Sequence, residues 1–284
     1  MSDIRLLSQA EFPTLLKEIT DPPEKLYIEG ELPSPESKFL CVVGSRKYSP
    51  YGKDICTSLI QGLAGQPIVI VSGLALGIDA VAHQAALDAG LKTIAVPGSG
   101  LGRQVLYPST NRHLADEIVT KGGALISEYE PTFRATTWTF PKRNRLMAGM
   151  SHAVLVIEAE NKSGTLITAR LAMEYNRDVL AVPGSIHSST SDGPHNLIRD
   201  GAALIRNSDD ILEALGLSVE SKEAISYNDC TPEEQHLISF LSSPRPKEEL
   251  FSLLEMPVSE ANIILSALEI KGIITETMGE IRLR

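Results

Sequence analysis

The stretch from Phe39 to Arg46, FLCVVGSR, indicates the fold: a short apolar run ends in glycine and serine. The same arrangement recurs at Ile68–Gly73, which reads IVIVSG. Both runs are continuously apolar rather than alternating, as expected for strands buried on both faces of a parallel sheet. Further apolar runs follow at Thr93–Val96, Ala124–Ile126, Ala153–Ile157, Val179–Val182 and Ala203–Ile205.

Helical patterns lie between these apolar runs. They fall at Gly52–Leu63, Asp79–Asp88, Asn111–Thr120, Leu166–Tyr175 and Asp209–Leu215. Alternating strands and helices predict an α/β fold with a doubly wound, mostly parallel, Rossmann-like sheet. Residues 1–217 are expected to form this domain, beginning with a helical lead-in, Met1–Leu32, that turns at Asp21-Pro22-Pro23.

The texture of the sequence changes after residue 217. Residues 218–230 are polar and mixed, which predicts a linker, and residues 231–284 are expected to form a small second domain. Thr231 and Pro232, followed by two acids, are typical of a helix start. Helices are then expected at Lys247–Leu254 and Ser259–Lys271, followed by a hairpin of Ile273–Thr277 and Glu280–Leu283, which together predict a winged helix.

Charge and composition restrict the possible functions. The chain of 284 residues carries a net charge of −10, so any nucleic-acid site must be a local basic cluster. The predicted winged helix is itself acidic, and its last helix carries only Lys271 as a cation, against Glu260 and Glu269. Duplex binding by this module is therefore disfavoured, and a protein contact or a structural role is expected.

Neither export nor a cofactor is indicated. The N-terminus lacks the apolar core of a signal peptide, and no apolar stretch reaches membrane-spanning length. The 3 cysteines lack C-x-x-C spacing, so a reducing cytoplasm and no metal are expected. No P-loop occurs, and Gly98–Gly102 is not a dinucleotide fingerprint, so no cofactor is expected.

Small residues follow most of the predicted strands. Because ligands of open α/β sheets bind beyond the carboxyl ends of the strands, several such turns together predict a phosphate-binding crevice. A single turn would say little, since any strand–helix turn favours glycine and serine. The turns are Gly44-Ser45-Arg46, Ser72-Gly73 with Gly77-Ile78-Asp79, Pro97-Gly98-Ser99-Gly100, Ser163-Gly164-Thr165 and Pro183-Gly184-Ser185.

Trp138–Arg145, WTFPKRNR, is the most informative stretch for function. Lys142, Arg143 and Arg145 stand beside the aromatic residues Trp138 and Phe140. Cations pair with phosphates and aromatic rings stack on exposed bases, so the stretch predicts contact with a single-stranded nucleic acid. Arg46 is expected to point into the same crevice. The alternative is a solvated basic helix start with Phe140 packed in the core.

Two other features are interpreted as structural. Asp79 and His83 lie four residues apart and lack a third catalytic or ligating group. Asp79 is therefore expected to be an acid at a helix start, with His83 packed beside it. The polar loop Ser188–Pro194, between His187 and His195, is expected to be mobile or a lid, and no metal is proposed there.

Many ordered blocks resemble the DNA-processing protein A (DprA/Smf) family, from about Leu16 to Leu215. The blocks that carry the resemblance are Gly44-Ser45-Arg46, Ser49-x-Tyr51-Gly52, Ser72-Gly73-Leu74-Ala75-x-Gly77-Ile78-Asp79, Ala82-His83, Tyr107-Pro108-x-x-Asn111, Ser127-Glu128, Phe140-Pro141-x-Arg143-Asn144-Arg145, Ala148-Gly149-x-Ser151, Glu158-Ala159, Ser163-Gly164-Thr165-Leu166, Thr168-Ala169-Arg170, Ala181-Val182-Pro183-Gly184 and Asn196-Leu197-Ile198. The lead-in Asp21-Pro22-Pro23-x-x-Leu26-Tyr27 fits as well.

The resemblance implies a dimeric, non-enzymatic protein that binds incoming single-stranded DNA in natural transformation and helps load the RecA recombinase. The stretch Asn196–Ile205 is one candidate contact surface for the homodimer. The DNA-binding residues are then expected to be Gly44, Ser45, Arg46, Ser72, Gly73, Phe140, Lys142, Arg143, Asn144, Arg145, Ser163, Gly164 and Thr165.

Two other functions compete with this interpretation. One is a nucleotide-processing enzyme of the related lysine-decarboxylase-like class, whose glycine-rich turn usually has a glutamate three residues after the threonine. Here Thr165 is followed at that spacing by Thr168, and nothing places Glu158 or Glu174 as a substitute. The other is a pure protein-interaction module.

Overall fold

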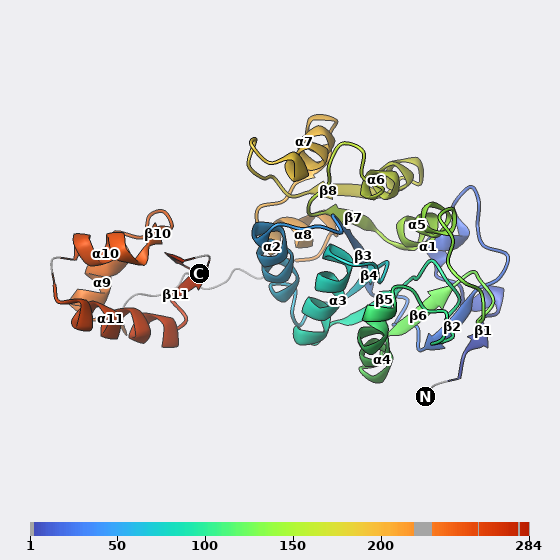
Figure 1. The fold of residues 1–284 in the computed structure, drawn as a ribbon, viewed down its shortest axis with the longest axis horizontal. Coiled ribbons are helices and arrows are strands. Elements are labelled where there is room, and N and C mark those ends of the chain that lie inside the picture. The colour runs from blue at the N-terminus through green and yellow to red at the C-terminus, as the bar shows by residue number, and fades with distance from the viewer. Residues whose placement is uncertain (1–2, 219–228, 255, 278, 284) are drawn as a thin grey trace. The chain divides into compact units, whose positions relative to one another are not determined.

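The structure is a computed structural model that describes residues 3–218, 229–254, 256–277 and 279–283. The chain divides into two compact units, residues 1–219 and 220–284 (Figure 1). Each unit has a hydrophobic core of its own. Most of the predicted linker, 218–230, lies outside the described residues.

The larger unit is built on one nine-stranded sheet with the order β1-β2-β6-β5-β4-β3-β7-β8-β9. Strands β3 to β9 are parallel to one another, and β2 pairs antiparallel with β6 and β1 antiparallel with β2. The strands are β1 (Arg5–Leu6), β2 (Tyr27–Gly30), β3 (Lys38–Val43), β4 (Ile68–Ser72), β5 (Lys92–Ala95), β6 (Ala124–Ser127), β7 (Ala153–Val156), β8 (Asp178–Ala181) and β9 (Ala203–Leu204). Every apolar run predicted to be a strand forms one, and the α/β fold is confirmed.

Helices cover both faces of the sheet, because successive side chains of a strand point to opposite faces. In β3, Cys41 and Val43 enter one core, and Leu40 and Val42 enter the other. The first core is covered by α1 (Thr14–Lys17), α5 (Thr139–Met150), α6 (Thr165–Glu174) and α7 (Asp192–Arg199). The second is covered by α2 (Pro50–Gln61), α3 (Ile78–Asp88) and α8 (Ser208–Ala214), and α4 (Arg112–Thr120) packs next to α3.

The prediction of a helical lead-in is wrong for its two ends. The lead-in holds the 3₁₀ turn η1 (Gln9–Glu11) and the short α1, but Arg5–Leu6 and Tyr27–Gly30 are strands. Tyr27–Gly30 pairs antiparallel with β6, and Leu26 and Ile28 are completely buried. The open edge of β6 supplies the hydrogen-bonding partners, which a local sequence pattern does not reveal.

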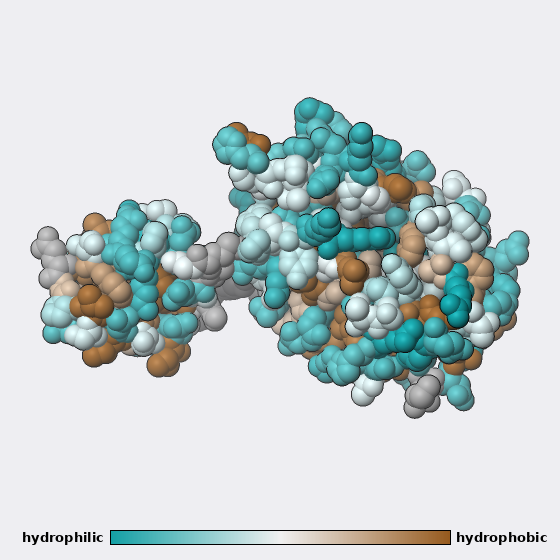
Figure 2. Space-filling view, in the orientation of Figure 1, coloured by the Kyte–Doolittle hydropathy of each residue, from teal (hydrophilic) through white to brown (hydrophobic). Residues whose placement is uncertain are grey.

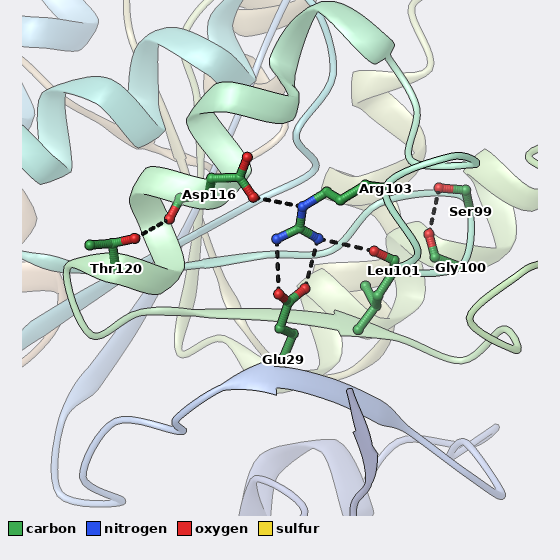
Figure 3. Close-up of polar contacts among 7 residues, drawn as sticks. All are labelled: Glu29, Ser99, Gly100, Leu101, Arg103, Asp116 and Thr120. Carbon is green, nitrogen blue, oxygen red and sulfur yellow. Dashed lines mark hydrogen bonds and ion pairs between the residues drawn. The ribbon is translucent and has the colours of Figure 1, made fainter. Parts of the chain in front are cut away.

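Arg103 fixes this added edge to the rest of the domain (Figure 3). Its Nη1 and Nη2 donate to the two carboxylate oxygens of Glu29 at 2.7 and 2.9 Å. Its Nε donates to Asp116 of α4 at 2.7 Å, and its Nη1 also donates to the Leu101 carbonyl at 3.0 Å. Because Glu29 is only 3% exposed, this ion pair satisfies a buried charge and ties β2, α4 and the loop after β5 together.

Two helices of the larger unit were not predicted. The first is α5, in which the polar Arg143, Asn144 and Arg145 are buried together with the apolar residues that follow them. The second is α7, which directly follows the 3₁₀ turn η3 (Ser189–Ser191). Another 3₁₀ turn, η2 (Ser109–Asn111), directly precedes α4. The structure thus has η3 and the start of α7 where a mobile loop or lid was expected at Ser188–Pro194. The Thr190 carbonyl accepts from Ala159 N at 2.7 Å, which fixes this segment at the end of β7.

The smaller unit contains α9 (Pro232–Ser239), α10 (Lys247–Leu253), α11 (Val258–Ile270) and the strands β10 (Arg245–Pro246), β11 (Ile274–Thr277) and β12 (Glu280–Leu283). The strands form a sheet with the order β10-β12-β11. Thr231 and Glu234 form a capping box at the start of α9, and Lys271 binds Glu234 at 2.6 Å. The three helices and the hairpin lie where they were predicted. Assignment to the winged-helix class stays a prediction.

A helix that crosses a bilayer needs about 20 predominantly apolar residues. No single helix among the described residues has that length and composition. Only α10 and α11 taken as a pair, bent by 117° at their break, meet these two criteria.

Candidate nucleic-acid interface

The candidate site lies where the order of the parallel strands reverses. From β3 the chain proceeds to β4, β5 and β6 on one side, and then returns to place β7 on the other side of β3. Loops that leave β3 and β7 in opposite directions open a crevice at this switch point. A pocket of about 570 Å³ lies there, lined by the loop after β3, the start of α5 and the start of α6. Figure 2 shows hydrophilic side chains gathered in this part of the larger unit.

The loop after β3 is held closely against the start of α3. Ile78 N donates to the Ser45 carbonyl at 3.1 Å. Gly77 has a φ of +90°, and a Cβ there would lie 2.3 Å from the Ser45 carbonyl oxygen and 2.5 Å from the Arg46 Cα. Only glycine therefore allows this approach, which places Gly44, Ser45 and Arg46 at the pocket.

The start of α6 forms the opposite wall of the pocket. The Thr165 hydroxyl donates to the Gly44 carbonyl at 3.0 Å and so joins the two turns that line the crevice. Ser163 Oγ accepts from Thr165 N at 3.2 Å. A Cβ on Gly164 would meet nothing within 4 Å, so the backbone at the start of this helix is open to a ligand.

The basic stretch of α5 is divided between two faces of the helix. Phe140, Arg143, Asn144 and Met147 line the pocket, and this spacing of three and four residues marks one helical face. Lys142 and Arg145 are absent from the pocket lining and instead meet another element, the end of β6.

Lys142 and Arg145 are engaged with Glu128, which follows β6. Arg145 Nη2 donates to Glu128 at 2.6 Å, its Nη1 donates to the Asp21 carbonyl at 2.6 Å, and its side chain is buried. Lys142 Nζ lies 3.7 Å from Glu128. The expectation that both cations belong to the pocket is therefore wrong, because a helix turns about 100° per residue and separates neighbours in sequence.

Arg143 lines the pocket, but its donors are used inside the protein. It is buried, and its Nη1 donates to the Gly73 carbonyl at 2.5 Å and to the Val96 carbonyl. The Asp79 carboxylate accepts from Gly73 N at 3.1 Å and from Ala75 N at 3.4 Å. Burial raises the pKa of Asp79, and the charge of Arg143 opposes this shift. Arg143 therefore fixes the ends of β4 and β5 beneath the pocket.

Exposed cations at the pocket are Arg46, Lys47 and Lys162, with Glu160 as an acid among them. None of these cations forms an ion pair within the described part of the chain. The Arg46 Cζ lies 5.4 Å from the centroid of the Phe140 ring. Lys47 and Lys162 were not predicted as site residues. Lys47 follows Arg46 and Lys162 precedes Ser163, so their positions next to two predicted turns were the available signal.

The remaining predicted residues lie beneath or beside the pocket. Ser72 is buried and donates to the Val42 carbonyl at 2.7 Å, so it does not reach the pocket. Gly73 lines a small neighbouring hollow together with Arg46 and Phe140. The turns after β5 and β8 do not line the pocket, although a Cβ on Gly98 would meet Phe140 at 2.6 Å. Of the predicted turns, those after β3 and β7 contribute most of the crevice.

Asp79 and His83 have structural roles, in agreement with the sequence. Asp79 is an acid in the first turn of α3. His83 is buried, and its Nδ1 lies 2.7 Å from the Thr93 hydroxyl, which in turn donates to the Ile70 carbonyl at 2.8 Å. His83 thus links α3 to the centre of the sheet.

Comparison with known sequences identifies the family. The sequence model of the family described as DNA recombination-mediator protein A matches residues 3–216. The chain belongs to the DNA recombination-mediator protein A family. It is 44% identical over 204 residues to Protein Smf of Escherichia coli, which covers 72% of this chain and 54% of that protein. It is 46% identical over 201 residues to DNA processing protein DprA of Streptococcus pneumoniae, which covers 71% of this chain and 70% of that protein.

Solved structures of the DNA recombination-mediator protein A family have the same fold. DNA processing protein A from Streptococcus pneumoniae superposes with a TM-score of 0.69 at 42% identity, covering 76% of this chain and 75% of that chain. DNA processing protein A from Helicobacter pylori, studied for its single-stranded DNA binding mode, superposes with a TM-score of 0.66 at 32% identity. That match covers 76% of this chain and 98% of the Helicobacter pylori chain.

Proposed function

We propose that this chain is a cytoplasmic, non-enzymatic protein that binds single-stranded DNA in the pocket between β3 and β7. The observation that carries the proposal is the set of exposed cations Arg46, Lys47 and Lys162 around one pocket beside the Phe140 ring. Cations without ion-pair partners attract phosphates, and an aromatic ring beside them suits an unstacked base. The net charge of −10 makes this cluster a local exception on an acidic protein.

The family relationship supports the same ligand. The Helicobacter pylori relative was studied for its single-stranded DNA binding mode, and the relative from Streptococcus pneumoniae is a DNA processing protein. By extension we propose that this chain acts on DNA in transformation and recombination, protects the strand, forms a homodimer and helps load the RecA recombinase. The surface Asn196–Ile205, which includes the edge strand β9, is the proposed dimer contact.

An enzymatic role of the lysine-decarboxylase-like kind is not favoured by the contacts of Glu158. This buried carboxylate accepts from Ser49 N at 2.9 Å, from Ser49 Oγ at 2.6 Å and from Thr190 Oγ1 at 3.0 Å. A Cβ on Gly52 would lie 2.3 Å from its Oε2. Glu158 is therefore engaged in fixing the start of α2 and does not replace the glutamate missing at Thr168.

The test is a titration of labelled oligo-dT and of a matched duplex, followed by fluorescence anisotropy across a range of salt. We expect tight binding to the single strand and much weaker binding to the duplex. For a single strand, each neutralised phosphate contributes about −0.7 to the slope of log K against log salt. Three engaged cations therefore predict a slope of about −2.

Variants separate the two groups of cations. On a short oligo-dT of about four nucleotides, charge reversal of Arg46 together with Lys162 is expected to abolish binding, whereas Lys142→Glu is expected to change it little, because Lys142 lies on the other face of α5. Unchanged affinity of the Arg46 and Lys162 variant at low salt would refute the proposed pocket. Release of a free base from nucleoside monophosphates would instead revive the enzymatic function.

A further inference from the structure

Trp138, the only tryptophan in the chain, is exposed and packs against two other aromatic rings. It directly precedes α5, and 54% of the residue is exposed. Its ring centroid lies 5.9 Å from that of Tyr129 and 6.2 Å from that of Phe133, in edge-to-face arrangements. Tyr129 and Phe133 are stacked on each other at 4.7 Å. The cluster therefore holds a large indole in place while leaving much of it open to solvent.

The aromatic cluster lies on the same edge of the sheet as the pocket. Tyr129 follows the carboxyl end of β6, and the Phe133 carbonyl accepts from Gly100 N, in the loop after β5, at 2.9 Å. The pocket lies at the carboxyl ends of β3 and β7. The ends of β3 and β6 are three strand spacings, about 14 Å, apart, and the start of α5 carries both Trp138, at the cluster, and Phe140, at the pocket.

A second pair of aromatic rings lies at the rim of the pocket. Phe140, at the rim of the pocket, lies 5.6 Å from Tyr107, centroid to centroid. Tyr107 is itself half exposed and lines the small hollow beside the pocket. Phe140 and Tyr107 thus supply aromatic surface at the rim of the pocket, and Trp138 lies two residues before Phe140 in the chain, so one strand can reach both groups of rings.

Cations also accompany Trp138. Arg134 is exposed and has no ion pair within the described residues. Lys142 lies four residues after Trp138, and its backbone N donates to the Trp138 carbonyl at 3.4 Å. The nearby acids are already engaged, Glu128 by Arg145 and Glu130 by Lys25. A phosphate chain can therefore pass this cluster without meeting an uncompensated acid.

We propose that Trp138 is a second base-stacking subsite, which binds a nucleotide of a single strand that extends beyond the pocket. This subsite rests on the proposed function, because it deepens the same DNA path. It explains why an indole stays exposed on a fixed support. Lys142, which does not line the pocket, would then lie beside the sugar-phosphate backbone of the bound strand.

The test uses the fluorescence of Trp138, which no other tryptophan obscures. Oligo-dT of about four and of about sixteen nucleotides spans the usual range of single-strand site sizes. We expect the long oligonucleotide to quench Trp138 and the short one, held in the pocket, to leave it largely unchanged. Trp138→Ala should bind the long oligonucleotide about 5- to 150-fold more weakly and the short one equally well. Trp138→Phe should recover part of the loss.

Two controls keep the subsite and the pocket distinguishable. Ile186→Ala removes another exposed apolar side chain, 81% exposed, and should change neither affinity. Arg46→Glu should weaken the binding of both lengths.

If the unchanged protein binds both lengths but shows no quenching, and Trp138→Ala binds like the unchanged protein, the subsite is refuted while the pocket stands. Equal losses for both lengths in Trp138→Ala would also refute it, and no binding by the unchanged protein would refute both proposals.

Discussion

The guanidinium of Arg46 lies against the ring of Phe140, with Cζ 5.4 Å from the ring centroid. The two residues come from different elements, the loop after β3 and the first turn of α5. Phe140 in turn is held against the backbone of Gly98, where a Cβ would approach within 2.6 Å. The ring therefore orients a cation that has no carboxylate partner in the part of the chain that the structure describes, and this leaves the charge of Arg46 available to a phosphate.

The contact between Arg46 and Phe140 predicts coupled effects on binding. Arg46→Met removes the guanidinium but keeps an unbranched side chain, and Phe140→Leu removes the ring but fills the space. In a double-mutant cycle on oligo-dT affinity, we expect a coupling free energy of about 0.5–1 kcal/mol, typical of an exposed cation–π pair. Strictly additive losses, measured by anisotropy at one fixed salt concentration, would show that the ring does not position Arg46.

Gly77 predicts a local defect in the same loop. In Gly77→Ala, the added Cβ would lie 2.3 Å from the Ser45 carbonyl oxygen, so the loop that carries Arg46 must move. We expect a loss of single-strand affinity together with a lower free energy of unfolding. Gly65→Ala is the matched control, because Gly65 has a similar φ of +79° but nothing within 4 Å of its Cβ position. Both variants place alanine at a positive φ and so strain the backbone, but only Gly77→Ala should bind single-stranded DNA more weakly. Equal affinities for the two variants would contradict the role given to this loop.

The parallel sheet was predictable because its signal is local. Each central strand is a short apolar run that ends in small residues, and burial on both faces requires this pattern. The crevice followed from topology, since the carboxyl ends of parallel strands share one edge. Gly44, Arg46, Gly164 and Thr165, which the sequence predicts at the crevice, line the pocket.

The rest depended on contacts between distant residues. Lys142 and Arg145 are close to Arg143 in sequence, but the helical rotation that separates them is visible only once α5 is recognised as a helix. Its polar residues hid that helix, because Arg143 and Arg145 are buried by partners far along the chain. The strand Tyr27–Gly30 was missed for a similar reason, since β6, its partner, begins almost a hundred residues later.

Arg103 predicts how strongly this edge strand is fixed. Arg103→Met would leave the buried Glu29 carboxylate without its partner, and breaking a buried pair in this way costs about 3–5 kcal/mol. Urea unfolding should show this loss for the larger unit. Arg206→Met is the control, because the Arg206–Asp210 pair is exposed on its Arg206 side and should contribute no more than about 1 kcal/mol. A similar, small effect of both variants would mean that Glu29 gains water when Arg103 is removed.

His83 predicts a dependence of stability on pH. Burial, assisted by the charge of Arg143, lowers the pKa of His83 from 6.5 to about 3 in the folded protein. Between these two values the unfolded chain binds a proton at His83 and the folded protein does not. The free energy of unfolding should therefore fall as the pH drops from 6.5 toward 3, by up to about 1.4 kcal/mol per pH unit from this residue alone.

His83→Asn should remove this dependence, because asparagine keeps an amide nitrogen near the Thr93 hydroxyl but does not titrate. The measurement is urea unfolding of the variant and the unchanged protein at several pH values between 6.5 and 4.5. We expect the variant to be less stable at pH 6.5, and the difference between the two proteins to shrink as the pH falls. His187→Asn, at an exposed histidine, should leave the pH profile unchanged. A constant difference between the His83 variant and the unchanged protein would show that His83 takes up its proton in the folded state as readily as in the unfolded chain.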